Sequence, residues 1–274
     1  MRKTKSDKPR AAKVSETANE GADARSGDCG LKPGNGPRGS TSCLVVVPLY
    51  KPELDSAEED ALGRSLALLE EFEVRYLTYP ELPLGWYERR WGKKRLILME
   101  ASNFRSARTY SALLLSKAFY DALSGFEYHL ICQTDAIVFK RELGFWVSQG
   151  YDYLGAPWPD GWEMKFPTGK TLKEPNPLLV RVFVGNGGLS LRRTEAMARA
   201  LDAFPAACDL WKNLGNPEDL FFSAALNLMA HVRLPNVATA ASFSRELNPG
   251  GFLAKVLGDV ESFGAHQWTR RAKG

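Results

Sequence analysis

The chain has 274 residues, of which 44% are apolar, and it carries 36 Lys and Arg against 32 Asp and Glu. This length and composition allow one large domain or two small ones with a real core, and they exclude a wholly disordered chain or a small disulfide-built protein. The longest apolar runs fall far short of the ~20 residues that a membrane-spanning helix needs, so a soluble or peripheral protein is expected.

The basic surplus is confined to the N-terminal residues. Residues 1–40 hold nine basic and five acidic side chains, which leaves 27 of each sign in the other 234 residues. Residues 1–40 also contain no aromatic residue and few branched aliphatic ones. Residues 1–42 are therefore predicted to be a disordered basic tail, and residues 43–274 a single ordered domain. The neutral remainder argues against nucleic-acid binding. The tail would be attracted only weakly to anionic lipids at the inner face of a membrane.

Two further patterns bear on location and on cofactors. No apolar stretch of signal-peptide length follows the basic start, and the four cysteines lack C-x-x-C spacing, so reduced thiols and a cytoplasmic protein are expected. Gly34, Gly36 and Gly39 form a G-x-G-x-x-G pattern, but it precedes a strand instead of following one, so it is not a phosphate-binding loop.

The first predicted elements form one βαβ unit. The β-branched run over 44–47, stopped by Pro48, predicts a strand buried on both faces. A capping box from Ser56 to Glu59 then opens a helix, and residues 74–78 predict a second strand.

The alternation continues through a strand at 96–99, a helix over 106–123 and a strand over 128–132. Repeated β and α segments predict an α/β fold with a mostly parallel central sheet and helices on both faces. Ligands collect at the carboxyl ends of such strands, so the residues that follow position 132 are the first candidates for a site.

Gln133, Thr134 and Asp135 follow the buried strand directly. Apolar residues resume at once after Asp135, which solvation alone does not explain. The carboxylate either caps a loop or helix, or it is a metal ligand at the edge of the sheet.

Residues 151–158 predict a short strand that runs into an aromatic loop. Five prolines, two glycines, Trp158 and Trp162 lie in residues 157–178, a composition typical of a binding loop. The two indoles either stack on sugar rings or bases, or pack the loop onto the core.

The last third of the chain contains two polar segments. Gly185, Gly187 and Gly188 surround Asn186 before a renewed strand pattern, which indicates a tight turn or a close approach by a ligand. Pro217 then opens a helix whose first turn holds Glu218 and Asp219, acids that complement the helix dipole or take part in catalysis. Residues 237–243 predict a strand, and His266 lies near the end of the chain.

In this order the segments resemble the GT-A class of nucleotide-sugar glycosyltransferases, and more narrowly an uncharacterised family catalogued as a domain of unknown function. The resemblance covers residues 43–268 and rests on five segments: PLYKP at 48–52, QTD at 133–135, YDYLGAPW at 151–158, GNGGLSLR at 185–192 and PEDLFFS at 217–223. It implies a Rossmann-like GT-A fold. In that class a nucleoside diphosphate sugar is the donor, and a divalent ion meets the charge of the leaving diphosphate.

The resemblance also implies site residues. Pro48, Tyr50, Gln133, Asp135, Gly187 and Gly188 would bind the donor, whereas Trp158, Trp162 and Asn186 would bind substrate. Asp135 stands at the last position of the Asp-x-Asp metal motif of the class, but Gln133 replaces its first Asp. His266 is the expected additional ligand of Mn²⁺ or Mg²⁺. By analogy with β-1,4-galactosyltransferase-like members, Asp219 would be the general base, with Glu218 orienting an acceptor hydroxyl or the donor sugar.

The sequence therefore predicts a metal-dependent, inverting glycosyltransferase that moves a sugar from a UDP-type donor to a glycan, lipid-linked or protein acceptor, with bacterial surface glycans as one setting. Two alternatives remain. One is a catalytically inactive nucleotide- or carbohydrate-binding protein, which the loss of the first Asp permits. The other is a nucleotidyltransferase, although residues 50–53 lack the Gly-rich basic loop typical of that class.

Overall fold

The buried strand predicted at the start of the ordered chain is β1 (Cys43–Pro48), and all six of its residues are buried. It pairs in parallel with β2 (Glu73–Thr78) on one side and with β4 (Tyr128–Cys132) on the other. Beyond β2, β3 (Arg95–Leu98) is also parallel. These four predicted strands are confirmed, and the carboxyl ends of β1 and β4 lie next to each other at one edge of the sheet.

The computed structural model describes residues 42–170, 177–246 and 261–267. All of them belong to one unit that spans Gly39–Gly274. Except for Ser42, the predicted tail over residues 1–42 lies outside the described residues, as does Cys29, and its disorder remains a prediction.

The other end of the main sheet is antiparallel. β7 (Pro177–Arg193) runs antiparallel to β4, and β6 (Tyr153–Pro167) runs antiparallel to β7, which gives the strand order β3-β2-β1-β4-β7-β6. Three of the five pairings are parallel, so the predicted mostly parallel sheet is confirmed. A small second sheet has the order β5-β9-β8, from β5 (Ile137–Val138), β9 (Gly264–His266) and β8 (Ser244–Glu246).

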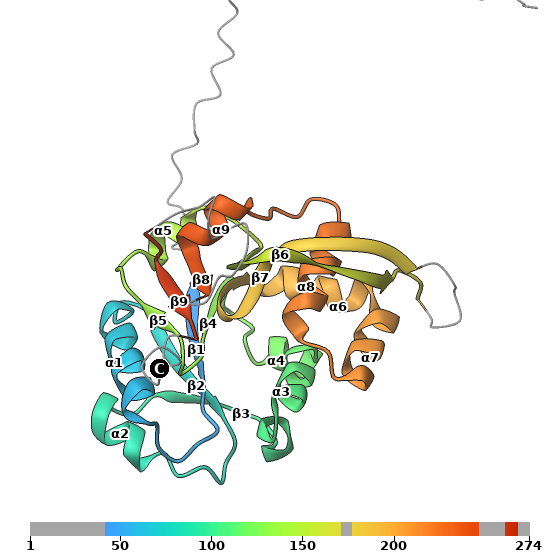
Figure 1. Ribbon diagram of the computed structural model, residues 1–274. Helices are drawn as coiled ribbons and strands as arrows, with labels where there is room; N and C mark the ends of the chain where they lie inside the picture. Colours follow the sequence, from blue (N-terminus) through green and yellow to red (C-terminus); the bar gives the residue numbers. More distant parts are fainter. Residues whose placement is uncertain (1–41, 171–176, 247–260, 268–274) are drawn as a thin grey trace, which may run out of the picture. The chain divides into compact units, whose positions relative to one another are not determined.

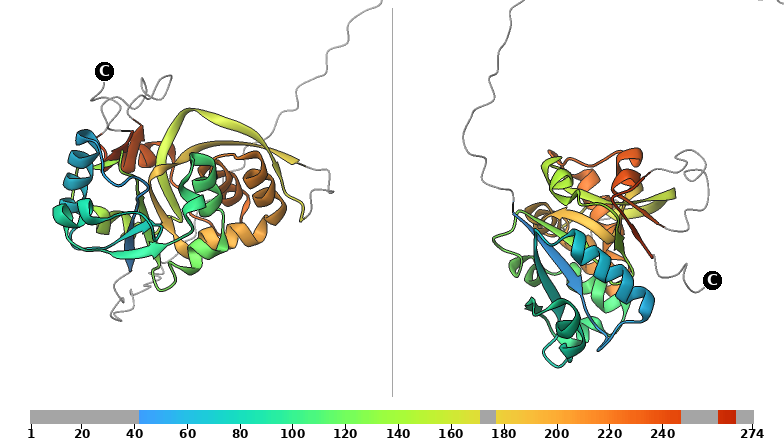
Figure 2. Two further views of the ribbon diagram at one scale, coloured as in Figure 1. Left: turned by 90° about the horizontal axis from the view of Figure 1, so that it is seen from below. Right: turned by 90° about the vertical axis from the view of Figure 1, so that its left-hand side faces the viewer.

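Helices cover both faces of the main sheet, as predicted (Figures 1 and 2). Because side chains alternate along a strand, Leu44 and Val46 of β1 join one hydrophobic cluster and Val45 and Val47 join another. The second cluster packs under α1 (Ser56–Leu68) and α2 (Gly85–Trp91). The first packs under α3 (Ala107–Leu114), α4 (Lys117–Asp121), α6 (Thr194–Ala203), α7 (Pro205–Leu214) and α8 (Glu218–Leu228). The other helical segments are η1 (Ala101–Phe104), α5 (Leu143–Ser148) and α9 (Val237–Phe243).

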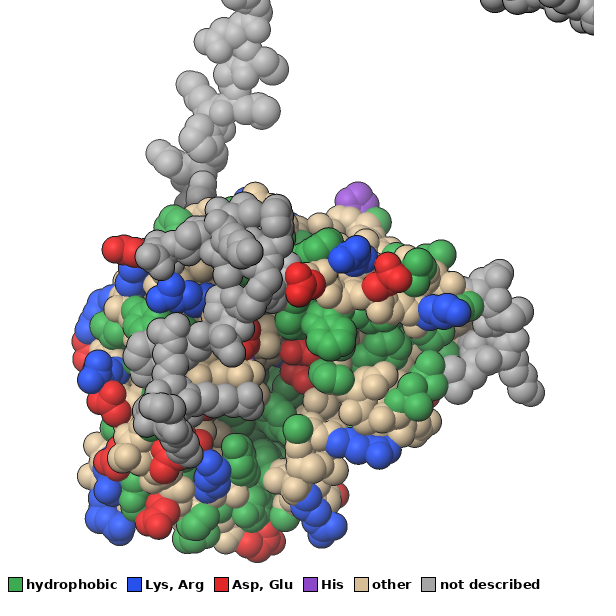
Figure 3. Space-filling view, viewed as in Figure 1, with side chains coloured by type: hydrophobic (Ala, Val, Ile, Leu, Met, Phe, Trp, Pro, Cys, Tyr) green, Lys and Arg blue, Asp and Glu red, His purple; other side chains and the backbone are tan. Residues whose placement is uncertain are grey.

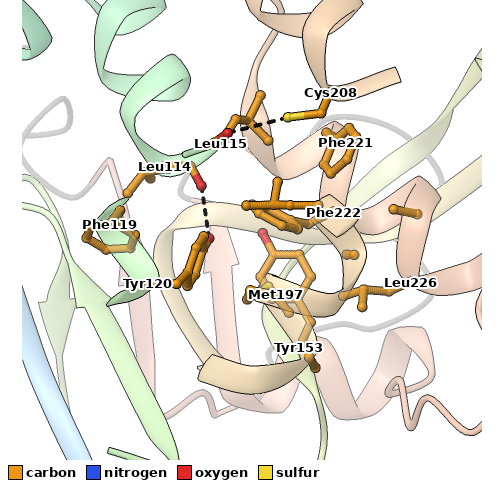
Figure 4. Packing of buried hydrophobic residues seen from close by; sticks show 14 of the residues in the cluster. Leu114, Leu115, Phe119, Tyr120, Tyr153, Met197, Cys208, Phe221, Phe222 and Leu226 are labelled. Carbon is orange, nitrogen blue, oxygen red and sulfur yellow. Dashed lines mark hydrogen bonds between the residues drawn. The ribbon is translucent and has the colours of Figure 1, made fainter. Parts of the chain in front are cut away.

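The core beneath α8 is rich in aromatic side chains. Tyr120, Phe222 and Tyr153 lie next to one another there, and the Tyr120 hydroxyl donates to the carbonyl of Leu114 at 3.0 Å (Figure 4). This packing holds α4, α8 and β6 together directly below the segment that carries Gly185–Gly188.

Four predicted elements differ in the structure. The helix over 106–123 is two helices, because Ser116 caps α4 by accepting from the N–H of Phe119 at 3.3 Å. Residues 237–243 form α9 and not a strand, with Asn236 as its N-cap. The capping box of α1 is Asp55 with Glu58, one residue earlier than predicted. Of the loop predicted over 157–178, residues 157–167 belong to β6 and residues 177–178 to β7, while residues 171–176 lie outside the described residues.

The cysteines behave as the sequence suggests. Cys43, Cys132 and Cys208 are free and buried, and Cys132 is 1% exposed, as expected for a small buried hydrophobe. Within the described part of the chain, no helix has both the length and the apolar character needed to cross a membrane.

Candidate functional site

A pocket opens at the carboxyl ends of β1 and β4. Its volume is about 280 Å³, and its lining residues come from β1, η1, α3 and the loop after β4: Pro48, Tyr50, Phe104, Arg105, Ser106, Ala107, Tyr110, Gln133, Thr134 and Asp135. The structure thus brings together four of the six residues predicted to bind the donor. This is the edge where a parallel sheet is expected to bind ligands.

Glu58 holds the loop that carries Gln133 and Asp135 in place. This buried carboxylate accepts from the Thr134 hydroxyl at 3.0 Å and from Lys51 Nζ at 2.8 and 2.9 Å. The Gln133 N–H donates to the carbonyl of Gly188 at 3.0 Å. These contacts join both walls of the pocket to the start of α1 and to β7, so Asp135 is presented at a defined position.

His266 lies among three side chains with oxygen acceptors. Its Nε2 is 3.5 Å from Asp135 Oδ1 and 3.2 Å from Gln133 Oε1, and its Nδ1 is 2.7 Å from Glu246 Oε1. Burial alone would lower the pKa of His266, but hydrogen bonds with Asp135 and Glu246 outweigh it and raise the pKa to about 9. Asp135 and His266 therefore meet, although they are far apart in the sequence.

These residues fit a divalent ion that completes its coordination with substrate oxygens. In the described residues no group of three or more His, Cys, Asp or Glu side chains could hold a metal by itself. Asp135 and His266 would supply two ligands to such an ion, which would replace the proton on His266 Nε2, and the amide oxygen of Gln133 lies beside them. When the His266 Nδ1–H donates to Glu246, Nε2 is the ring nitrogen that faces Asp135, the usual arrangement for a metal-bound histidine.

Glycines make room for this arrangement. A Cβ on Gly188 would lie 2.1 Å from the His266 ring, and a Cβ on Gly187 would lie 2.8 Å from Glu218 Oε1. Gly185 has φ +125°, which a residue with a side chain rarely adopts. The Asn186 side-chain oxygen accepts from the N–H of Gly188 at 3.1 Å. Asn186, a predicted substrate-binding residue, therefore also stabilises the turn over residues 185–188.

Asp219 lies at the start of α8 beside the same turn. Its Oδ2 accepts from the N–H of Gly187 at 3.1 Å and its Oδ1 from the N–H of Leu220 at 2.8 Å. Burial and the neighbouring Glu218 carboxylate raise the pKa of Asp219 to about 7, against the lowering effect of these hydrogen bonds. A carboxylate with such a pKa can take up a proton near neutral pH.

Glu218 is engaged within the protein. Its Oε1 accepts from Arg192 Nη2 at 3.2 Å and its Oε2 from the Ser111 hydroxyl at 2.9 Å. The Arg192 side chain is fully buried. No local sequence pattern marks this ion pair, because the two residues are 26 positions apart and on different elements.

The two tryptophans lie in β6, and neither lines the 280 Å³ pocket. Trp158 is partly buried and packs against the hydrophobic cluster under α8. This agrees with the second of the two predictions for the indoles, packing onto the core. Trp162 is paired with Val182 and is 50% exposed, so its ring is available to a ligand or partner.

Sequence reasoning missed Phe104, Arg105 and Tyr110, which line the pocket from η1 and α3. The signal was present, because residues 104–106 follow the strand at 96–99 and parallel strands end at the same edge of a sheet. Arg105 is exposed at the wall of the pocket. Hydrophobic side chains also gather in the middle of one face of the molecule, with most basic side chains toward its margins (Figure 3).

Three solved structures resemble this fold at low similarity. The apo form of mouse xyloside xylosyltransferase 1 has a TM-score of 0.42 and 11% identity, over 82% of this chain and 96% of that chain. Core-mannan synthase A from Aspergillus fumigatus in its Mn/GDP form has a TM-score of 0.46 and 11% identity, over 72% of each chain. The galactosyltransferase LgtC in complex with donor and acceptor sugar analogues has a TM-score of 0.46 and 13% identity, over 81% of this chain and 86% of that chain.

No curated protein matches the chain in sequence. The resemblance to an uncharacterised family is confirmed by a match over residues 93–266, more than half of the chain. The chain therefore belongs to the family described as "Protein of unknown function (DUF5672)".

Proposed function

We propose that this protein is a metal-dependent, inverting glycosyltransferase that uses a nucleotide sugar. The observation that carries the proposal is the meeting of Asp135, Gln133 and His266 at the end of β4, between a pocket on one side and the Gly187–Asp219 contact on the other. The reaction needs a donor site, a group that neutralises the leaving charge and a base. The pocket, the residues around Asp135 and the Asp219 carboxylate would supply these three at one edge of the sheet.

The pocket suits the nucleotide part of the donor. Tyr50 and Phe104 provide aromatic surface, and Arg105 provides a positive charge at a lining position. A volume of about 280 Å³ is near the lower end for small-molecule sites, so it would hold a nucleoside while the sugar extends toward Gly187 and Gly188. The proposed donor is a UDP-type sugar.

Asp135 and His266, with the amide oxygen of Gln133 beside them, would hold the metal ion. An oxygen and nitrogen ligand set suits Mn²⁺ well and Mg²⁺ acceptably. When bound, the ion neutralises charge on the leaving diphosphate. Gln133 brings no charge, and Glu246 strengthens the site by orienting His266.

Asp219 would act on the acceptor. Its carboxylate takes the proton of the acceptor hydroxyl while that oxygen forms the new bond to the anomeric carbon. The bond from that carbon to the diphosphate oxygen breaks, and the diphosphate leaves with the electron pair. Attack opposite the leaving group inverts the anomeric carbon. The acceptor is a glycan, a lipid-linked sugar or a protein, and Trp162 offers an exposed ring for it.

The test is nucleotide release from a panel of UDP, GDP and CMP sugars with Mn²⁺, in the wild type and in Asp135→Ala and Asp219→Ala. We expect turnover with one donor class and loss in both variants, whereas Asp60→Ala, an exposed change on α1, should retain it. Thermal stabilisation by nucleotide without turnover would identify an inactive binding protein. Pyrophosphate release from a nucleoside triphosphate would identify a nucleotidyltransferase, and full turnover in both variants would overturn the site.

A further inference from the structure

Arg192 is a buried charge directly beneath the candidate site. Its side chain is fully buried, and its guanidinium lies over the rings of Tyr153 and Phe222, with centroid distances of 5.2 and 5.8 Å. Its Nε donates to the Ser190 hydroxyl at 2.9 Å. A buried charge is stable only when hydrogen bonds and an opposite charge offset its loss of hydration. The Arg192 guanidinium therefore depends on its partners.

The ionic partner of Arg192 is Glu218, whose two oxygens are both used. Oε1 receives Arg192 Nη2 and Oε2 receives the Ser111 hydroxyl, at 3.2 and 2.9 Å. Glu218 is only 6% exposed. This burial leaves Glu218 without access to an acceptor or donor hydroxyl, whereas Asp219, which is bonded to backbone N–H groups, is partly exposed.

Gly187 connects the pair to Asp219. Its carbonyl accepts from Ser190 Oγ at 3.0 Å and faces Arg192 Nη2 at 3.5 Å, while its N–H donates to Asp219 Oδ2. A Cβ at this position would lie within 3 Å of both Glu218 Oε1 and Arg192 Nη2. One peptide unit therefore touches the ion pair on one side and the proposed base on the other.

Ser111 extends the connection to the pocket. It lies on α3, whose preceding residues Ser106, Ala107 and Tyr110 line the 280 Å³ pocket. The hydrogen bond from Ser111 to Glu218 joins this wall to the first turn of α8, where Asp219 lies.

We propose that Arg192 and Glu218 form a buried positioning pair, which holds Gly187 and Asp219 in a fixed geometry and, through Ser111, ties them to the pocket wall. Glu218 is thereby a positioning residue and not a group that contacts substrate. The inference rests on the proposed role of Asp219 as the base.

The charges around Asp219 give this proposal a specific signature. The ionisable groups that face it are Glu218 on α8, Arg192 on β7 and Tyr153 on β6, with Tyr110 and Tyr120 around the ion pair. Replacing Glu218 with Gln removes the nearest negative charge but keeps the size of the side chain. The Asp219 carboxyl should then ionise at lower pH, by about 1 unit.

The experiment follows the Asp219 carboxyl carbon by NMR titration of the full chain, with Asp219→Asn identifying its signal. The variants are Glu218→Gln, Ser111→Ala and, as a matched control, Asp152→Asn. Asp152 is a buried carboxylate that pairs with the partly exposed Arg193, which follows Arg192 on β7 and therefore lies on the opposite face of the sheet. We expect a lower midpoint in Glu218→Gln and the wild-type midpoint in Ser111→Ala and in Asp152→Asn.

Transfer kinetics supply a second readout that a purely structural role would not move. Glu218→Gln should lower kcat about 10-fold with the KM of donor and acceptor unchanged, and the acid limb of its pH profile should shift with the NMR midpoint. If Glu218→Gln does not fold, Ser111→Ala, which keeps the ion pair, carries the test with a fall in kcat of about 5-fold.

Three results would overturn the inference: an unchanged Asp219 midpoint in folded Glu218→Gln, a raised acceptor KM at constant kcat, or wild-type kcat in Ser111→Ala. Absence of transfer in the wild type with every donor would instead reject the proposed function. The NMR titration would then still show whether the Arg192–Glu218 pair sets the pH at which Asp219 ionises.

Discussion

The site joins two regions of the molecule that are built differently. On one side, β1 and β4 are parallel, fully buried strands whose carboxyl ends carry Tyr50 and Asp135. On the other, β6 and β7 form a long antiparallel hairpin that reaches the surface and contacts Asp219 through Gly187. Under the proposed function, the parallel region would hold the leaving group and the hairpin region would position the proton acceptor. The two meet where His266 packs against Gly188.

The largest expected effect comes from separating these regions at Gly188. In Gly188→Ala the new Cβ would lie 2.1 Å from the His266 ring, so the ring must move away from Asp135. Misplacement by about 1 Å costs roughly 100-fold in rate, and we expect that loss in turnover together with weaker Mn²⁺ binding by calorimetry. Gly144→Ala, whose Cβ would meet nothing closer than Phe72 at 3.9 Å, is the control. Wild-type turnover in Gly188→Ala would show that the two regions do not depend on this contact.

The pH dependence between pH 5 and 8 tests Asp219, the proposed base beside the hairpin region. Because Asp219 has a pKa raised to about 7, it is protonated below that pH and cannot accept a proton. We expect kcat/KM to rise with pH, reach a plateau above pH 8 and be about 100-fold lower at pH 5. Nucleotide binding measured at the same pH values separates loss of the base from loss of the donor site. A flat profile from pH 5 to 8 would remove Asp219 from the mechanism.

Glu246→Gln tests the proposed metal site while both proposed ligands, Asp135 and His266, stay unchanged. The change removes the carboxylate that receives the His266 Nδ1–H at 2.7 Å. Loss of such a partner typically costs 10–100-fold in metal affinity, and we expect about 10-fold for Mn²⁺ by calorimetry. Arg192 and Asp219 do not contact Glu246, so the pH midpoint of Asp219 should stay where it is. Unaltered Mn²⁺ affinity would mean that His266 is not a ligand.

Trp162→Ala should have the smallest effect, confined to the hairpin surface. Its ring is half exposed, so folding stability should change by no more than about 0.5 kcal/mol. If the ring stacks on the acceptor, acceptor KM rises a few-fold while donor KM does not. Trp158→Ala is the informative partner, because that ring packs against the core and its loss should cost about 3 kcal/mol in urea unfolding.

The same two regions differ in how far the sequence predicted them. Continuous apolar runs and strand-end polar residues were enough to locate β1, β4 and Asp135 correctly. In the hairpin, prolines and glycines predicted a loop, and that prediction was wrong. β6 is an edge strand, where a missing N–H is tolerated, and its register shifts between Leu154 and Trp162 accommodate the irregular residues.

Other failures have a common cause in tertiary contacts. The pairing of Arg192 with Glu218 and of Glu246 with His266 depends on elements that meet only in the folded chain, and no local pattern marks them. The resemblance to a known class singled out Asp135 and His266 as metal ligands; the structure brings them to 3.5 Å, and their binding of a metal stays a prediction. It also implied that Glu218 orients an acceptor hydroxyl or the donor sugar; both Glu218 oxygens are hydrogen-bonded inside the protein, and that role stays a prediction.

The position of β9 has a consequence for synthesis of the protein. The six-stranded sheet is complete at Arg193, whereas β9, which carries His266, enters between β5 and β8 from the far end of the chain. A ribosome therefore releases Asp135 and Asp219 long before the histidine. The main sheet can assemble on the nascent chain while His266, one of the two proposed metal ligands, is still missing. If the proposed function holds, catalytic competence would arrive as the last step of biogenesis, after the scaffold has folded.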